Sequence, residues 1–483
     1  MSVKNDYEAV IGIEVHAQLL TQTKMFCGCS AAFGGSPNSY TCPICQGMPG
    51  VLPVINKRAI EFSIRTALAF NCTVNASCRF ARKHYYYPDM PKNYQISQYE
   101  EPLAEHGWLE IDLDGQTRRI GIQRLHLEED VGKLIHEGAL ETAQSSLVDF
   151  NRSGVPLMET VSKPDIRSPE EAAAYLKAFR AILVYLGVCD GNMEEGSMRC
   201  DANISLRSRG ASEFGTKVEI KNMNSFKNVQ HALAFEIERQ AKLLSRGERI
   251  VQETRLWNAD KGQTLSMRSK EYAHDYRYFP EPDLMPLEIE QAWVDEIKRG
   301  LPELPRARRQ RFVSQYGIPE YDADLLTSDR ALADYYEEVV RLHPNPKAAS
   351  NWIMSELLRE LRGDPASVVS TPIRPEQFAK LLKLQDDGTI SGKIAKEVFE
   401  KMARSGEDPE AIVKREGLVQ VADAGALAAI VDQVIAANPG AAQDFVKGKK
   451  QSLGFLVGQV MKATQGKANP QLVNDLLISR LKP

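Results

Sequence analysis

Four cysteines near the amino terminus constrain the fold more than any other feature of this sequence. Cys27 and Cys29 form a C-x-C pair, and Cys42 and Cys45 form a C-x-x-C pair after twelve intervening residues. Four thiolates presented by two tight turns match a tetrahedral Zn²⁺ site, and the Gly-Gly-Ser-Pro-Asn stretch at 34–38 suits a loop that folds back. No local cysteine is left over for an open coordination position, so the metal is expected to be structural. A redox C-x-x-C motif is the rival interpretation, but it leaves the C-x-C pair unexplained.

The length and charge of the chain limit its architecture and its partners. A chain of 483 residues is too long for one ordinary core and predicts several domains. With 60 basic and 64 acidic residues the net charge is −4, so any nucleic-acid binding must come from local basic patches. The first residues do not read as a signal peptide, and no apolar run reaches the length of a membrane span. We therefore expect a cytoplasmic protein without membrane contact.

Residues 1–293 are expected to form an α+β domain with a mixed or antiparallel sheet. Alternating apolar patterns predict strands over 124–130, 155–161, 202–207 and 217–221, in runs and without regular βαβ alternation. One helix within this region has clear end signals. Ser168 is its predicted N-cap, Pro169 its first residue and Glu171 the partner in a capping box, and Gly187 follows its last turn.

The remaining chain is predicted to be helical and to form two parts. Residues 294–405 are expected to be an all-helical domain, and residues 406–483 a helical tail that opens with Asp408 and Pro409 as N-cap and first helical residue. An alanine-rich helix is predicted over 422–437, and a helix pair follows. The lysines of this tail are Lys447, Lys449, Lys450, Lys462 and Lys467. Such a pair can bind a phosphate backbone, but a plain terminal helical hairpin explains the pattern equally well.

The strand-like segment IGIEVH, residues 11–16, carries two polar groups on one face. Because side chains alternate along a strand, Glu14 and His16 share a face opposite to the apolar residues. A solvated polar face is the simpler interpretation of this segment alone. Further acids in the same domain make a divalent-metal site plausible when the set is taken together: Glu128, Glu129, Glu159, Glu194, Glu195 and Asp201. Glu128 and Glu129 are adjacent, so both can serve one site only if the strand ends or bulges there.

Residues 80–100 interleave cationic and aromatic side chains. Lys83 and Lys92 flank three consecutive tyrosines, a composition that can hold a base, a phosphate or an RNA end. For this stretch alone, packing of the tyrosines as the edge of a core is the simpler interpretation. The sequence contains no G-x-x-x-x-G-K-[ST] phosphate loop, so an ATP-using enzyme would need another phosphate cradle.

These motifs together closely resemble the B subunit of the bacterial GatCAB complex, the glutamyl/aspartyl-tRNA amidotransferase. The matching stretches cover essentially the whole chain: IGIEVHAQL, CPICQGMPGVLPVIN, YYYPDMPKNYQISQ, RLHLEEDVGK, MEEGSMRCDANISLR, EIKNMNSF, DYRYFPEPDL and GFLVGQVMKATQGKANPQLVN.

The resemblance implies a kinase-like cradle, a helical domain and a YqeY-like tail that grips tRNA. The cradle would use ATP to phosphorylate the side-chain carboxylate of glutamate on tRNA(Gln), or of aspartate on tRNA(Asn), and ammonia would displace the phosphate. The ammonia would come from glutamine hydrolysed in the A subunit and travel through a channel, while the C subunit holds the heterotrimer together. The activity implied is that of a glutamine-hydrolysing carbon-nitrogen ligase with ATP as cofactor.

The resemblance also assigns residues. Mg²⁺ would be bound at Glu14, His16, Glu128, Glu129 and Glu159, of which Glu14, Glu128 and Glu159 would be catalytic. Histidine is an unusual Mg²⁺ ligand, so His16 points to a site that also tolerates Mn²⁺. Lys83 and Lys92 fall in the segment similar to the channel lining, and with Glu195 and Asp201 they are expected to bind cofactor. The four cysteines match family members that bind zinc.

Two alternatives remain open. The chain could be a zinc-braced tRNA scaffold whose acids are incidental, or a free-standing ATP-dependent amide ligase that acts on a small carboxylate. The lysine-rich tail is the feature that argues against the second alternative.

Overall fold

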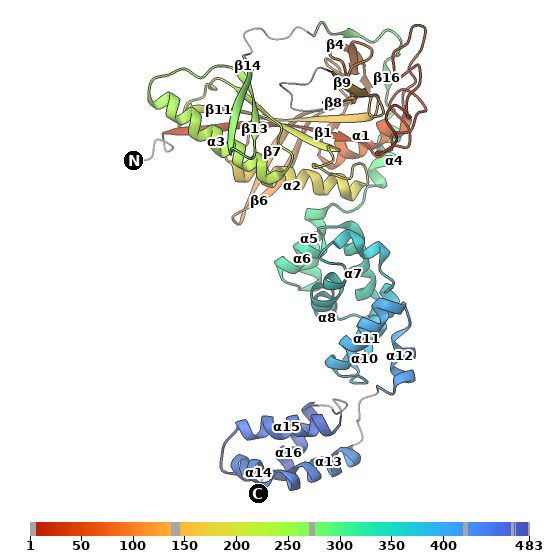
Figure 1. Ribbon diagram of the computed structural model, residues 1–483, viewed down its shortest axis with the longest axis vertical. Coiled ribbons are helices and arrows are strands. Elements are labelled where there is room, and N and C mark those ends of the chain that lie inside the picture. Colours follow the sequence, from red (N-terminus) through yellow and green to blue (C-terminus); the bar gives the residue numbers. More distant parts are fainter. Residues whose placement is uncertain are drawn as a thin grey trace. The chain divides into compact units, whose positions relative to one another are not determined.

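The computed structural model describes residues 6–136, 145–269, 276–418, 424–464, 468 and 470–481 (Figure 1). The chain forms two compact units, Met1–Leu304 and Pro305–Pro483. Helix α4 (Gln291–Arg299) spans the expected boundary at 293/294 and buries Val294 and Ile297 in the core of the first unit. Among the described helices, none is both long and apolar enough to cross a membrane.

A nine-stranded mixed sheet organises the first unit. Its strands lie in the spatial order β14 (Gln263–Ser269), β13 (Glu253–Asn258), β12 (Val218–Lys221), β11 (Met198–Ser208), β1 (Tyr7–Gln18), β10 (Pro156–Ser162), β7 (Gln116–Glu129), β6 (Ala104–Leu113) and β2 (Thr73–Val74). Neighbouring strands are antiparallel except for the parallel pair β12 and β13. The strands expected over 124–130, 155–161, 202–207 and 217–221 are confirmed as parts of β7, β10, β11 and β12.

Shorter strands pair outside the large sheet. β4 (Ala81–His84) lies between β5 (Tyr94–Ser97) and β15 (Phe279–Pro280), β3 (Ser77–Cys78) pairs with β16 (Leu287–Glu288), and β8 (Lys133–His136) pairs with β9 (Ser146–Asp149). β4 and β5 bring the aromatic and cationic residues of 80–100 together as a hairpin.

Helices cover one face of the large sheet. They are α1 (Lys57–Ala69), α2 (Pro169–Leu186) and α3 (Phe226–Ser245), and α2 and α3 run side by side across the sheet (Figure 1). Ile11, Ile13 and Val15 of β1 are fully buried in the core beneath them. Burial of these apolar side chains fixes the register of β1, because a slip by one residue would turn the apolar face away from the helices. The alternate residues Glu14 and His16 consequently point to the opposite face.

Helix α2 has the predicted ends. Ser168 Oγ accepts a hydrogen bond from the backbone N–H of Glu171 at 3.1 Å, Pro169 is the first residue, and Gly187 closes the helix with a φ of 65°. Glu171 does not complete a regular capping box. Its carboxylate accepts from the backbone N–H of Arg167, one residue before the N-cap, and also pairs with Arg118 of β7.

The second unit is built of helices in the residues described. They are α5 (Pro305–Tyr316), α6 (Glu320–Leu326), α7 (Arg330–Leu342), α8 (Pro346–Trp352), a π-helical turn (Ile353–Leu357), α9 (Leu358–Glu360), a 3₁₀ turn (Pro365–Ser370), α10 (Pro375–Asp386), α11 (Gly392–Ser405), α12 (Pro409–Glu416), α13 (Ala424–Ala437), α14 (Pro439–Val446), α15 (Gln451–Ala463) and α16 (Pro470–Leu481). The α+β class with a helical carboxy-terminal region is therefore confirmed.

Two separate hydrophobic clusters lie within the second unit. One is formed by buried residues between Phe312 and Val413, and the other by buried residues between Leu427 and Leu481. Helix α12 has the predicted N-cap Asp408 and packs with the first cluster through Ile412 and Val413. The predicted alanine-rich helix is α13, although residues 422 and 423 lie outside the described residues, as does Lys467.

Candidate functional site

The face of the sheet opposite the helices carries ionisable side chains from neighbouring strands. The pairing register sets Glu14 of β1 opposite Asp201 of β11, and His16 of β1 opposite Glu159 of β10. Glu159 is in turn opposite His126 of β7. Because directly opposed side chains on one face of a sheet are near neighbours, the register alone gathers these groups at the centre of the sheet.

His16, Glu128 and Glu159 form the first group. One ligand atom from each lies within 4.8 Å of the others. His16 Nε2 is 3.2 Å from Glu159 Oε2 and 3.7 Å from Glu128 Oε1, and His126 Nε2 is 3.4 Å from the same Glu159 oxygen. Both carboxylates are buried. This arrangement of one imidazole and two carboxylates matches a divalent-cation site.

Glu14, Asp201 and Glu219 form the second group, again with one oxygen from each within 4.8 Å of the others. Asn203 Nδ2 donates to Glu14 Oε1 at 2.8 Å, and Lys221 Nζ donates to Asp201 Oδ2 at 2.5 Å. Glu219 was not anticipated from sequence. Its segment was recognised as a strand, but only the pairing of β12 with β11, which sets Glu219 opposite Asn203, brings it here.

Burial and neighbouring charges shift the pKa values of these side chains. Burial, followed by the charges of Glu159 and Asp201, raises the pKa of Glu14. For His16, burial lowers the pKa, but the hydrogen bond and charge of Glu159 outweigh it and raise the value to about 9. For Glu159, burial is outweighed by His126 and His16, which hold its pKa well below the ordinary value. Buried carboxylates packed this closely are typical of functional sites.

Glu129 does not join Glu128. The two residues pair in consecutive register with Leu157 and Pro156, so β7 has no bulge at this point and their side chains point to opposite faces. The carboxylate of Glu129 accepts hydrogen bonds from Lys92 Nζ and from the backbone N–H of Ile96. The structure thus places Glu129 and Lys92 as a buried ion pair on the other side of the strand, beside a cavity of about 240 Å³.

Lys83 and Glu195 have different surroundings. Lys83 of β4 lies 5.2 Å from the ring centroid of Tyr276. Burial lowers the pKa of Lys83, but the charge of Glu128, together with other groups that include Glu159, outweighs burial and raises the pKa. The ammonium therefore interacts electrostatically with the carboxylates of the first group. Glu195 lies in a turn where its backbone N–H donates to Asn192 Oδ1 at 3.1 Å, and its side chain belongs to neither group.

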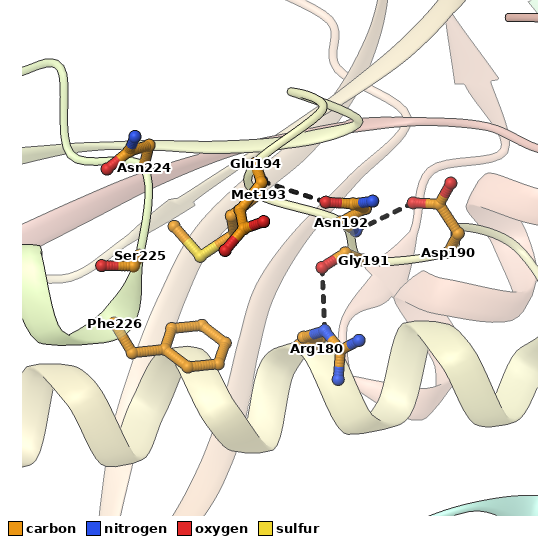
Figure 2. Close-up of a pocket in the computed structure, with 9 residues that line it drawn as sticks. All are labelled: Arg180, Asp190, Gly191, Asn192, Met193, Glu194, Asn224, Ser225 and Phe226. Atoms are coloured by element: carbon orange, nitrogen blue, oxygen red, sulfur yellow. Dashed lines mark hydrogen bonds between the residues drawn. The ribbon is translucent and has the colours of Figure 1, made fainter. Parts of the chain in front are cut away.

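A cavity of about 470 Å³ lies beside this turn, where α2 and the start of α3 approach each other (Figure 2). Arg180 Nε donates to the carbonyl of Gly191 at 2.8 Å, and Glu194, Asn224 and Phe226 also line the cavity. Of the acids that the sequence suggested for a metal site, Glu194 lines this cavity, whereas Glu14, Glu128 and Glu159 do not.

A smaller cavity adjoins the second group. It has a volume of about 300 Å³ and is lined by residues that include Gly12, Glu14, Asn203, Phe214 and Lys217. Gly12 has no side chain, so the backbone of β1 itself lines the cavity at this point. Phe214 is 63% exposed. An aromatic face, a cation and a carboxylate group therefore meet at the edge of one cavity.

Asp130 organises the end of β7 and was not anticipated from sequence. Its carboxylate accepts hydrogen bonds from Gln18 Nε2 at 2.7 Å and Arg199 Nη2 at 3.0 Å, and it lies 3.7 Å from Arg152 Nε. It thereby connects β7 with β1 and β11. Burial raises the pKa of Asp130, but Arg199 and Arg152 outweigh burial and hold the pKa below its ordinary value.

Asp130→Asn should therefore destabilise the protein by about 2 kcal/mol at pH 7, because it removes the charge-assisted hydrogen bond and ion pairs that the partly exposed Arg199 and Arg152 make with the buried carboxylate. The folded-state pKa is lowered, so this stabilisation is present above the ordinary value of 3.8 and is lost as the pH falls below it. Urea unfolding of both proteins at pH 7 and below pH 4 measures the difference. Asp114→Asn, in an exposed turn, is the control. Equal stabilities at pH 7 would contradict the role given to Asp130.

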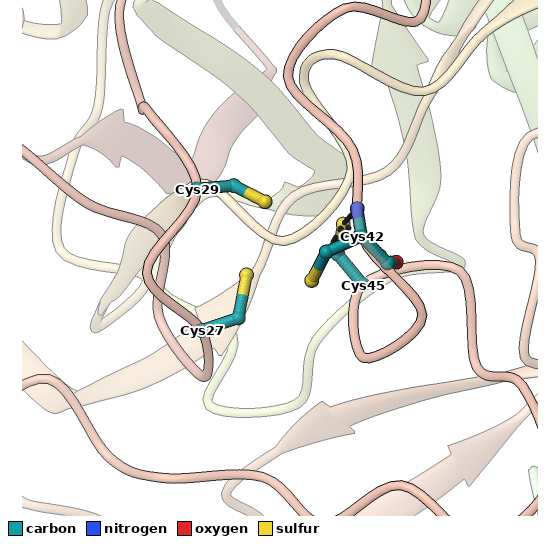
Figure 3. Close-up of side chains that lie close together, drawn as sticks. All are labelled: Cys27, Cys29, Cys42 and Cys45. Atoms are coloured by element: carbon teal, nitrogen blue, oxygen red, sulfur yellow. Dashed lines mark hydrogen bonds between the residues drawn. The ribbon is translucent and has the colours of Figure 1, made fainter.

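The four cysteines form the third group. Their Sγ atoms all lie within 4.8 Å of one another, and the two pairs face each other from two loops (Figure 3). Sulfur atoms at the corners of a zinc tetrahedron are about 3.8 Å apart, so the cluster fits this ion. The backbone N–H of Cys42 donates to Cys45 Sγ at 3.2 Å. A hydrogen bond from Cys27 and the charge of Lys24 contribute to a lowered pKa of Cys45, which favours the thiolate.

Comparison with known proteins identifies the family of this chain. The sequence-family model of the GatB/GatE catalytic domain matches residues 9–295, and the family model of the GatB domain matches residues 334–481. The B subunit of the aspartyl/glutamyl-tRNA(Asn/Gln) amidotransferase of Carboxydothermus hydrogenoformans is 60% identical over 99% of both chains. Its counterpart in Moorella thermoacetica is 58% identical over 99% of this chain and all of its own. The chain therefore belongs to the family of B subunits of the aspartyl/glutamyl-tRNA(Asn/Gln) amidotransferases.

Proposed function

We propose that this chain is the ATP-dependent subunit of a tRNA amidotransferase that works with an A subunit and a C subunit. It phosphorylates the side-chain carboxylate of glutamate carried by tRNA(Gln), or of aspartate carried by tRNA(Asn). The observation that carries the proposal is the pair of adjoining carboxylate groups on one face of the sheet, next to a cavity with an exposed aromatic ring. Membership of the family supports the choice of substrate.

The chain's own residues would hold two divalent cations. His16, Glu128 and Glu159 would hold one, and Glu14, Asp201 and Glu219 the other. Mg²⁺ or Mn²⁺ bound there would offset the negative charge that builds up as the terminal phosphate of ATP meets a carboxylate. Asn203 and Lys221 orient the second group, and His126 orients Glu159. In this proposal Glu129 is not a metal ligand, because Lys92 neutralises it on the other face.

The cavity beside Glu14 suits the nucleotide. The exposed ring of Phe214 offers a face on which adenine can stack, and Lys217 offers a cation for a phosphate. The carboxylate of the charged amino acid would approach from the side of Lys83, whose ammonium can hold it close to the first group.

The reaction needs no side-chain nucleophile. A carboxylate oxygen of the amino acid bonds to the γ-phosphorus as the bond to the leaving oxygen of ADP breaks. Ammonia then attacks the acyl carbon, phosphate leaves with the bonding electrons, and a proton from the nitrogen passes to solvent or phosphate. Glutamine hydrolysis in the A subunit would supply the ammonia, and the segment of β4 and β5 with Lys83 and Lys92 is the proposed entry side.

Phosphate release from ATP tests this function directly. The chain is reconstituted with its A and C partners and ammonium, with and without Glu-tRNA(Gln). Release that requires the charged tRNA supports the proposal. Release that is indifferent to tRNA would favour a free-standing amide ligase.

The carboxy-terminal helices are proposed to bind tRNA. Residues 1–293, extended by α4 to Leu304, would be the kinase-like cradle, 294–405 a helical domain to which α12 also packs, and the rest of 406–483 a YqeY-like tail. Lys447, Lys449 and Lys450 lie together between α14 and α15, and only Lys449 has a nearby acid among the described residues, Asp444 at 3.2 Å. Clustered lysines of this kind can contact phosphates.

The four cysteines are proposed to hold a structural Zn²⁺. Metal analysis of the purified protein should give about one zinc per chain, because four thiolates fill the coordination sphere. Cys42→Ser together with Cys45→Ser should remove the zinc, whereas Cys72→Ser, at a buried cysteine outside the group, should not. A zinc-free wild-type protein with four reactive thiols would contradict the assignment.

A further inference from the structure

Lys24 is a completely buried lysine, with 0% of its surface exposed. Removing an ammonium group from water is costly unless a partner of opposite charge or strong hydrogen-bond acceptors replace the water. The structure provides two acceptors. Lys24 Nζ lies 3.2 Å from the carbonyl oxygen of Phe150 and 3.6 Å from Cys45 Sγ. Within the described part of the chain, no carboxylate lies at ion-pair distance from it.

The position of Lys24 links both halves of the cysteine cluster. Its backbone N–H donates to the carbonyl of Cys29 at 3.0 Å, and the neighbouring Thr23 pairs with Ser30, which closes the loop of the C-x-C pair. Its side chain reaches across to Cys45 in the C-x-x-C pair. One residue therefore contacts both loops, through its backbone on one side and its ammonium on the other.

The surroundings hold the ammonium in this place. Gly154 has a φ of +88°, and a Cβ atom there would lie 3.4 Å from Lys24 Cδ and 3.5 Å from Cys45 Cβ. The lysine stem and the cysteine thus pack against the same point of the backbone. Four thiolates around one Zn²⁺ carry a net charge of −2, so a cation buried against one of the sulfurs offsets part of that charge.

We propose that Lys24 is a positioning residue of the four-cysteine site, whose ammonium compensates the charge on Cys45 and holds the C-x-C loop against the C-x-x-C loop. The proposal rests on the zinc assignment made above. Lys24 does not coordinate the metal; it acts through the Cys45 sulfur. The metal and its thiolates supply the negative counter-charge for the buried ammonium. The ammonium in turn stabilises the bound metal.

Other contacts keep the loop docked when Lys24 is changed. Asn38 and Asn151 exchange hydrogen bonds with the backbone across the two segments: Asn38 Nδ2 donates to the Val148 carbonyl, and Asn151 Nδ2 donates to the Ser36 carbonyl. The backbone bond from Lys24 to Cys29 also survives substitution. Loss of the ammonium should therefore weaken zinc binding more than it changes the backbone conformation of the two loops.

The test compares zinc affinity in the full chain by competition with a chromogenic chelator. Lys24→Met should weaken zinc binding by about 10-fold or more, as for other residues that support a metal ligand from outside the coordination sphere. Lys24→Arg should retain most of the affinity. Lys57→Met is the matched control, since Lys57 is an exposed lysine 5.5 Å from the ring centroid of Trp293. If Lys24→Met does not fold, the comparison of Lys24→Gln with Lys24→Arg decides.

A spectroscopic measurement separates this role from a merely structural one. In protein reconstituted with Co²⁺, the thiolate-to-cobalt charge-transfer band should shift in Lys24→Met or Lys24→Gln and not in Lys57→Met, because the ammonium changes electron donation by the Cys45 sulfur. Unchanged affinity and an unchanged band in the neutral variants would overturn the role of Lys24. Failure of the wild-type chain itself to bind Zn²⁺ would instead overturn the zinc assignment, so the two outcomes are distinguishable.

Discussion

Glu159→Gln should lower tRNA-dependent release of phosphate from ATP by about two to three orders of magnitude, equivalent to about 3–4 kcal/mol in the barrier. Glutamine has nearly the volume of glutamate, so the packing of β10 is kept. The substitution removes the negative charge that lies 3.2 Å from His16 Nε2 and 3.4 Å from His126 Nε2. A cation site that loses one of two carboxylates no longer offsets the charge on the transferring phosphate.

The measurement uses the chain reconstituted with its A and C partners, saturating ATP, ammonium and Glu-tRNA(Gln). Glu8→Gln is the matched control, because Glu8 is on the same face of β1 as Glu14 but pairs with Arg207 outside both carboxylate groups. The control should retain most of the activity. Full activity of Glu159→Gln would contradict the proposed cation site. It would favour the alternative of a zinc-braced tRNA scaffold.

Truncation after Leu418 should weaken tRNA binding by about 100-fold at physiological salt and leave the first unit folded. The cut removes the hydrophobic cluster formed between Leu427 and Leu481, together with the lysines around α15. Each phosphate contact that is lost also removes the entropy gained from released counterions. A cut at 405/406, the boundary expected from the sequence, would also remove Ile412 and Val413 from the core of the remaining helices, so lost tRNA binding could not be separated from lost stability.

A pair of charge substitutions provides the control for the truncation. Lys449→Gln with Lys450→Gln should reduce the slope of log affinity against log salt by about 2 and leave all helices in place. Filter binding of Glu-tRNA(Gln) at several salt concentrations measures both variants. Unchanged affinity after truncation would show that the tail does not bind tRNA.

The site residues divide according to how far their placement depends on the fold. IGIEVH predicted that Glu14 and His16 share a face because alternation along a strand is a local property, and β1 confirms it. The same rule required a bulge to bring Glu128 and Glu129 together. β7 has none there, and Glu129 is paired with Lys92 instead. His126, Glu219 and Asp130 were missed because their neighbours come from other strands.

The sequence by itself determined the features that depend on neighbours along the chain. These are the class of fold, the strands around the site, the caps Ser168 and Asp408 and the spacing of the four cysteines. Only the tertiary structure decided which strands pair, and so which acids meet: β12 beside β11 brings Glu219 to Glu14, and β7 beside β10 brings His126 to Glu159. Strand order and register are set by burial of the opposite, apolar face over the whole sheet, and that energy is spread over residues far apart in sequence.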